Sequence, residues 1–151
     1  MKPMENKDKE YLFFWIALVV ITMLLFISNL QAQTPTKKEL FEELKRQNVI
    51  NPVAAFQISM LETGHLKSNI AKKQNNLFGL QNSCGYLEFS DWRECVKYFA
   101  KLECKWYDKF IKEYTGDYYD FIAFWGYKTG KSCSKKDIIY SEYLKKIKAP
   151  I

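Results

Sequence analysis

The sequence is poor in the residues that bind metal ions. It has a single histidine, His65, among 151 residues, and its four cysteines include no pair in the CxxC spacing. Structural zinc sites are built from cysteine and histidine ligands, usually in closely spaced pairs, so such a site is not expected here. No other metal and no cofactor is predicted. The cysteines fit an oxidising compartment better than a metal site.

Charge is missing from one long stretch near the N-terminus. No charged residue occurs from Tyr11 to Thr36, and residues 12–27, LFFWIALVVITMLLFI, are almost wholly apolar. This run predicts a hydrophobic helix of either of two kinds, a cleaved signal peptide or a retained transmembrane anchor, since its length lies between the two. The polar SNLQAQ that follows is typical of a cleavage region ending at Ala32. Either kind places the remainder of the chain outside the cytoplasm, in the periplasm or the extracellular space.

The domain organisation follows from this boundary. Residues 1–32 form the signal peptide or anchor, 33–36 a linker and 37–151 one domain, which is large enough to bury a core but too short for two. Membrane contact is expected only through the N-terminal segment. The sequence contains no internal repeat, and the protein is expected to act as a monomer.

Positive charge is concentrated in the predicted domain. The formal net charge is +6, and acidic and basic residues balance within the first 32 positions. A basic surface attracts polyanions, which outside the cytoplasm are cell-wall polymers and lipid head groups. The alternative is that the lysine pairs are simply solvated faces. No nucleic-acid-binding pattern accompanies the charge, so nucleic acid is not a predicted partner.

The cysteines allow two disulfide arrangements. Cys95 and Cys104 are nine residues apart on one predicted helix, on opposite faces and about 13 Å apart along its axis, so they cannot bond to each other. Two disulfides are therefore possible, each joining one of them to Cys84 or Cys133. The sequence leaves both connectivities open.

The domain is predicted to be mainly helical. Thr36 and Glu39 have the spacing of a capping box, and Asn51 followed by Pro52 is a strong helix start. Gly64 is the expected left-handed residue that ends this second helix. Helices are predicted at residues 36–47, 52–62, 66–73, 91–115, 117–127 and from about 137, with one short β-hairpin at 78–89.

One acidic residue occupies an unfavourable position in this layout. Glu62 ends the second helix, where unpaired carbonyls and the helix macrodipole present negative charge. Partial burial adds to this effect, and both favour the protonated acid. A protonated carboxyl group can donate a proton to a glycosidic oxygen, as the general acid does in sugar hydrolysis. The alternative is an exposed glutamate at a frayed helix end.

The stretch around Glu62 resembles a known catalytic core. Residues 59–80, SMLETGHLKSNIAKKQNNLFGL, are similar to the core of the glucosaminidase family of peptidoglycan hydrolases, the autolysin and flagellar-hydrolase type. Its members carry a helix ending in Glu-Thr-Gly-aromatic and, after a short helix, Asn-Leu-Phe-Gly. Residues 86–103 and the segments WGYKTG and YSEYLKKI resemble later blocks in the same order. The resemblance covers about residues 37–147.

The resemblance implies a fold and a set of site residues. The expected fold is lysozyme-like, α+β but mainly α, with the acid at the floor of a cleft. The implied catalytic residues are Glu62 as general acid and Tyr127 as a groove tyrosine facing the reacting sugar. The implied substrate-binding residues are Asn76, Phe78 and Gly79 of the turn and Tyr140 of the last helix. His65 occupies the family's aromatic position, which favours packing or sugar stacking over a role as base, and Trp92, Trp106 and Trp125 are expected in the core.

The sequence departs from the family in one respect. Many members have a longer β lobe that supplies a second acidic residue, whereas here only LQNSCG separates Gly79 from Tyr86. The nearest candidates for a second catalytic group are Glu88 and Asp91, or there is none. With one protein carboxyl group, the 2-acetamido group of the substrate can attack the anomeric carbon, and Tyr127 would orient that group or stabilise the developing charge.

Three functions are compatible with these features. The first is an endo-β-N-acetylglucosaminidase that cuts the β-1,4 bond of peptidoglycan glycan strands on the N-acetylglucosamine side. The second is a muramidase or a lytic transglycosylase. The third is a non-catalytic cell-wall-binding domain, which the presence of Glu62 together with the Asn-Leu-Phe-Gly turn disfavours.

Overall fold

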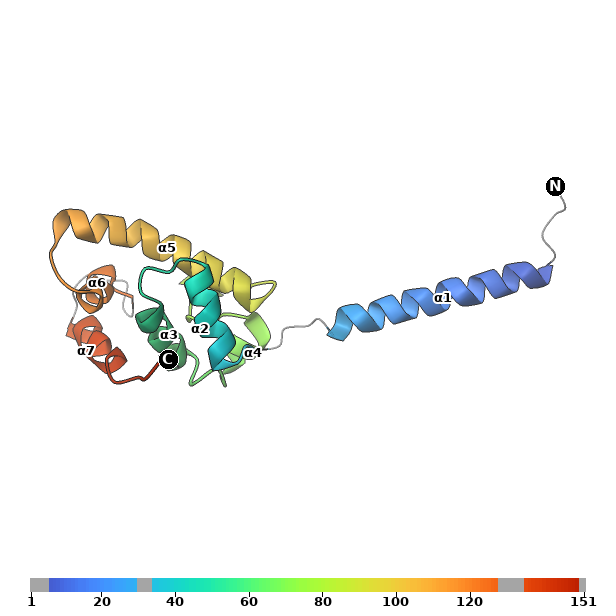
Figure 1. Ribbon diagram of the computed structural model, residues 1–151, viewed down its shortest axis with the longest axis horizontal. Coiled ribbons are helices and arrows are strands. Elements are labelled where there is room, and N and C mark those ends of the chain that lie inside the picture. The colour runs from blue at the N-terminus through green and yellow to red at the C-terminus, as the bar shows by residue number, and fades with distance from the viewer. Residues whose placement is uncertain (1–5, 30–33, 128–134, 150–151) are drawn as a thin grey trace. The chain divides into compact units, whose positions relative to one another are not determined.

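The computed structural model describes residues 6–29, 34–127 and 135–149, and it divides the chain into two compact units, Met1–Gln33 and Thr34–Ile151. The first contains helix α1, Asn6–Asn29, whose described side chains are exposed (Figure 1). Among the described residues, no helix combines the length and the apolarity needed to cross a membrane.

The second unit is mainly helical with one small hairpin, as the sequence predicted. Its strands, β1 (Gln81–Asn82) and β2 (Gly85–Tyr86), pair antiparallel. The longest described helix of this unit, α5, runs along one side, and α6 and α7 lie together near its C-terminal end (Figure 1). The described helices of this unit are α2 (Lys37–Arg46), α3 (Pro52–Glu62), α4 (Asn69–Gln74), α5 (Trp92–Glu113), α6 (Tyr118–Trp125) and α7 (Lys135–Leu144).

The predicted caps fix where α2 and α3 begin. The Thr36 hydroxyl oxygen accepts the Glu39 N–H at 3.2 Å while Glu39 Oε2 accepts the Thr36 N–H at 2.8 Å, so the capping box is present. At α3 the Asn51 side chain accepts the Ala54 N–H at 3.0 Å, and Pro52 is the first helical residue. These local signals confirm the expected register, in which Glu62 is the last residue of α3.

Helix α3 is the central element of the core. Seven consecutive residues, Ala54 to Met60, are buried, and α3 contacts both α2 and α7. A helix that is apolar on every side needs neighbours on every side, which explains why α3 is enclosed rather than lying on the surface. The enclosure leaves the two ends of the helix accessible, and Glu62 lies at the C-terminal one.

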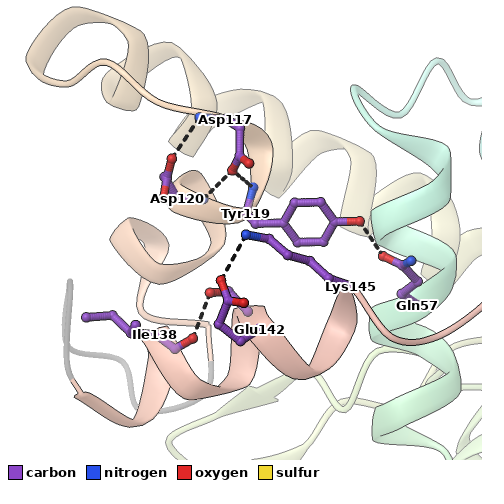
Figure 2. Close-up of polar contacts among 8 residues, drawn as sticks. Gln57, Asp117, Tyr119, Asp120, Ile138, Glu142 and Lys145 are labelled. Atoms are coloured by element: carbon purple, nitrogen blue, oxygen red, sulfur yellow. Dashed lines mark hydrogen bonds and ion pairs between the residues drawn. The ribbon is translucent and has the colours of Figure 1, made fainter.

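Polar contacts attach the last two helices to α3. The Tyr119 hydroxyl of α6 donates to Gln57 Oε1 of α3 at 2.8 Å (Figure 2). Gln57 Nε2 donates to the carbonyl of Ile147 at 2.7 Å. Lys145 pairs with Glu142 at 2.9 Å and lies over the Tyr119 ring. Because Gln57 is buried, losing these partners would leave its amide unsatisfied. The position of α7 relative to α3 is therefore fixed.

The disulfide prediction is wrong for the described residues. Cys84, Cys95 and Cys104 are all free thiols, and both proposed connectivities need Cys84 bonded to one of the other two. Cys133 lies outside the described residues. Cys95 is buried in the core and accepts a backbone hydrogen bond from Leu77, which gives it a packing role instead.

Candidate active site

The chain turns sharply directly after Glu62. Gly64, His65 and Leu66 are all left-handed, with φ of 55°, 61° and 68°. Such backbone costs a non-glycine residue about 1–2 kcal/mol, and the buried Thr63 hydroxyl compensates by donating to Ser59 O at 2.6 Å and accepting the Leu66 N–H at 2.9 Å. The expected left-handed Gly64 is confirmed. The turn ends α3 abruptly and leaves the Glu62 side chain partly exposed at its tip.

The Asn-Leu-Phe-Gly turn is held by its own asparagine. Asn76 is fully buried, and its Nδ2 donates to the carbonyls of Leu80 and Leu87, each at 2.8 Å. Its Oδ1 accepts the Leu80 N–H at 2.9 Å. All three hydrogen bonds that this amide makes within the described residues are therefore with backbone groups. Asn76 builds the turn, and it does not line the pocket described below.

Gly79 packs directly against the acid. Its φ is +63°, and a Cβ atom at this position would lie 3.0 Å from Glu62 Oε2 and 3.5 Å from Glu62 Cβ. A side chain would thus be strained in the backbone and would push the carboxyl group aside. The preceding ring, Phe78, is buried and stacks on Phe99 of α5 with centroids 4.0 Å apart. The turn is therefore clamped between the acid and α5.

Two tyrosines from the C-terminal part of the domain complete the surroundings of Glu62. The Tyr140 hydroxyl of α7 donates to Glu62 Oε1 at 2.8 Å. The Tyr127 hydroxyl donates to the Phe78 carbonyl at 2.5 Å, and the two tyrosine rings stack with centroids 6.1 Å apart. Burial and the negative charge of Glu62 raise the pKa of Tyr127 well above its ordinary value. Tyr127 consequently remains a protonated donor.

Glu62, Phe78, Gly79 and Tyr127 border a pocket of about 500 Å³, and Tyr140 is not among its lining residues. Glu62 is the only acidic residue among its lining residues in the described part of the chain, and Gln81 of the hairpin contributes an amide. The rest of the lining is mostly apolar. The lining residues are Glu62, Phe78, Gly79, Leu80, Gln81, Leu102, Trp106, Trp125, Gly126 and Tyr127.

The structure gives the other candidates different roles. Asp91 caps α5, because its Oδ1 accepts the backbone N–H groups of Arg93 at 2.6 Å and Glu94 at 2.9 Å. Glu88 is exposed, as is His65, and none of the three lines the pocket. Neither proposed second carboxylate is therefore among the residues that line the pocket with Glu62.

Sequence reasoning missed part of the pocket. Trp92 is buried as expected, and Trp106 and Trp125 are partly buried and pack against the core. Both also line the pocket, which the sequence did not predict. Both tryptophans lay on helical stripes, which predict burial. The informative signals were that Trp125 precedes Gly126 and Tyr127, and that Trp106 follows Leu102 by one helical turn.

A buried acid supports the other end of α3. Glu103 of α5 is fully buried, accepts the Ile50 N–H at 2.8 Å just before α3 and accepts the hydroxyl of Tyr118. Burial raises the pKa of Glu103, and these hydrogen bonds only partly oppose the effect. The side chain links α5, α6 and the start of α3. No group of three or more potential metal-ligating side chains occurs among the described residues.

Comparison with known proteins gives one match. The family model described as "Glucosaminidase: Mannosyl-glycoprotein endo-beta-N-acetylglucosaminidase" matches residues 38–150, which is most of the chain and includes every residue lining the pocket. No curated protein and no solved structure matches.

Proposed function

Since the chain belongs to the glucosaminidase family, we propose that it is a peptidoglycan hydrolase that cleaves the β-1,4 glycosidic bond on the N-acetylglucosamine side. Family membership by itself supports a more general description: the protein is a glycoside hydrolase that acts on a cell-wall glycan outside the cytoplasm. The observation that carries the finer proposal is the position of Glu62, which lines the pocket between Gly79 and Tyr127 as its only acidic group in the described residues.

In the proposed reaction Glu62 is the general acid. Tyr140 donates a hydrogen bond to Oε1, so in the neutral acid that oxygen is an acceptor and the proton belongs on Oε2. Oε2 is the oxygen that faces Gly79. The proton passes from Oε2 to the glycosidic oxygen while the bond from that oxygen to the anomeric carbon breaks, leaving Glu62 as a carboxylate.

The absence of a second acid among the described lining residues supports substrate-assisted attack. The 2-acetamido oxygen of the N-acetylglucosamine unit bonds to the anomeric carbon as the leaving group departs, and water then opens the ring formed. Glu62, now a carboxylate, accepts the proton of that water. The Tyr127 oxygen keeps acceptor capacity after donating to Phe78, and it can receive the acetamido N–H.

The test uses purified sacculi incubated with the wild type, Glu62→Gln and Glu88→Gln, with mass spectrometry of the released fragments. We expect new reducing N-acetylglucosamine ends from the wild type and from Glu88→Gln, and none from Glu62→Gln. Glu88→Gln is the matched control because Glu88 is exposed and lies outside the pocket lining. Undiminished release by Glu62→Gln would disprove the assignment of the acid.

The single acidic group also suits a second reaction. In a lytic transglycosylase the muramic 6-hydroxyl replaces water and a 1,6-anhydro product results, so one protein carboxyl group is sufficient. Reducing or anhydro muramic ends among the products of the same experiment would show that the enzyme cleaves on the muramic side instead. Binding of sacculi by all three proteins without release would identify a non-catalytic wall-binding domain.

A further inference from the structure

One side of the pocket is formed by α5 and has no role in the chemistry proposed above. Leu102 and Trp106 are one helical turn apart on this helix, and both line the pocket. Trp125, at the end of α6, lines it beside them. All three side chains are partly buried rather than enclosed.

Trp106 differs from the other rings of α5. Phe99 stacks on Phe78, and Phe110 packs against Phe121 and Phe124 of α6, so these rings belong to the core. Within the described residues Trp106 makes no ring–ring contact. Its charged neighbour, Lys109 Nζ, is 5.8 Å from the ring centroid, which is near the outer limit of about 6 Å for a cation–π contact. Trp106 packs against the core and also lines the pocket, and because it is only partly buried, some of its indole surface is accessible to a ligand.

Helix geometry separates Trp106 from the acid. Phe99 lies beneath the turn that holds Gly79 against Glu62. Trp106 follows seven residues later, about 10 Å farther along the helix axis. The indole thus borders the same pocket at a distance from the scissile bond, where a neighbouring sugar of a glycan strand would lie.

We propose that Trp106, flanked by Leu102 and Trp125, is a stacking platform for an N-acetylated pyranose next to the sugar whose bond is cleaved. One face of a β-linked pyranose presents several C–H groups, whose weak positive charge is attracted to the negative face of an aromatic ring. Gln81 supplies a polar group in the same pocket, and aromatic surface with a few polar groups is the usual composition of a ligand site. The inference rests on the proposed glycan substrate.

Binding is the appropriate test, because it does not depend on turnover. The full chain carrying Glu62→Gln is titrated with β-1,4-linked N-acetylglucosamine oligomers of increasing length, by calorimetry and by tryptophan fluorescence. Adding Trp106→Ala is expected to weaken binding of the longer oligomers about tenfold, a typical effect of losing one aromatic contact, and to leave the shortest unaffected. Adding Trp106→Phe should retain most of the affinity. The control is Tyr98→Ala, an exposed residue of α5 outside the pocket lining.

Several outcomes would overturn the platform. They are equal affinities with and without Trp106→Ala, an equal loss for every oligomer length, or no binding of any oligomer by the Glu62→Gln parent. Failure of the proposed function is seen separately, as unchanged product release from sacculi by Glu62→Gln. In the active protein Trp106→Ala should raise KM and leave kcat nearly unchanged, whereas a merely structural role would lower the thermal unfolding midpoint and kcat together.

Discussion

The two sides of the pocket are built in opposite ways. On the acid side, Glu62 is held by a hydrogen bond from Tyr140, packed against Gly79, and enclosed by a turn whose asparagine is satisfied entirely by backbone in the described residues. On the α5 side, Trp106 has no ring partner among the described residues and one loosely placed cation. The acid side is thus fixed by several directed contacts, whereas Trp106 is held mainly by packing against the core.

The difference matches what each side has to do. A proton donor must be held close to its productive geometry, since small displacements are costly in rate. A stacking surface tolerates small displacements. Substitutions on the acid side should therefore alter turnover or stability, and substitutions on the α5 side should alter affinity.

The largest effect is expected from Glu62→Gln. The amide keeps the shape of the side chain but cannot donate an acidic proton, so kcat on sacculi should fall by about 10²–10⁴, the usual contribution of a general acid. The measurement is the initial rate of fragment release. Circular dichroism should show an unchanged fold. A loss below about tenfold would contradict the role of Glu62 as general acid.

Gly79→Ala should be next in size. The left-handed backbone costs about 1–2 kcal/mol of folding stability, and the new Cβ would contact Glu62 Oε2 and displace the carboxyl group. We expect both a lower thermal unfolding midpoint and slower turnover. Gly64→Ala is the matched control, because Gly64 has a similar φ of 55° but nothing within 4 Å of the position that its Cβ would take. It should share the loss of stability. Equal turnover of the two variants would show that contact with Glu62 is unimportant.

The acid side was also the part more readily predicted from sequence, because its main signals are local. The end of α3 at Glu62 follows from Asn51, Pro52 and Gly64, all within the same short segment. The resemblance placed Asn76 in the groove lining, but its amide closes on Leu87, a pairing that no local pattern specifies. Periodicity predicted burial for Trp106, because a stripe does not show where the core ends and a pocket begins.

Long-range placement needed the structure. Tyr140 and Glu62 are 78 positions apart, and the resemblance alone implied that both belong to one site. Their hydrogen bond depends on how α7 packs on α3, which the buried Gln57 helps to fix. Sequence patterns identify such residues one at a time but do not give the contacts between them.

Tyr140→Phe tests that contact with a smaller expected effect. A hydrogen bond to an ionisable group contributes about 1.5–3 kcal/mol, so removing it should slow turnover by about 10- to 100-fold if the bond strengthens during proton transfer. Tyr143→Phe, an exposed tyrosine of the same helix, is the control. Turnover by Tyr140→Phe equal to that of the wild type would show that this hydrogen bond is unimportant for catalysis, and a lowered thermal unfolding midpoint with normal turnover would indicate a role in packing only.

The smallest effect concerns the support of α3 and appears in stability rather than rate. Burial raises the pKa of Glu103 above the ordinary 4.5, so the folded state binds this proton more tightly than the unfolded state. The stabilisation from this proton is complete below the pKa of Glu103 in the unfolded state and is lost as the pH rises through its pKa in the folded state. Urea unfolding of the wild type and of Glu103→Gln is measured from about pH 4 to about pH 8. The unfolding free energy of the wild type should fall relative to that of Glu103→Gln as the pH rises. Gln keeps an acceptor for Ile50 and Tyr118 without the charge, so a pH-independent difference would mean that folding does not raise the pKa of Glu103.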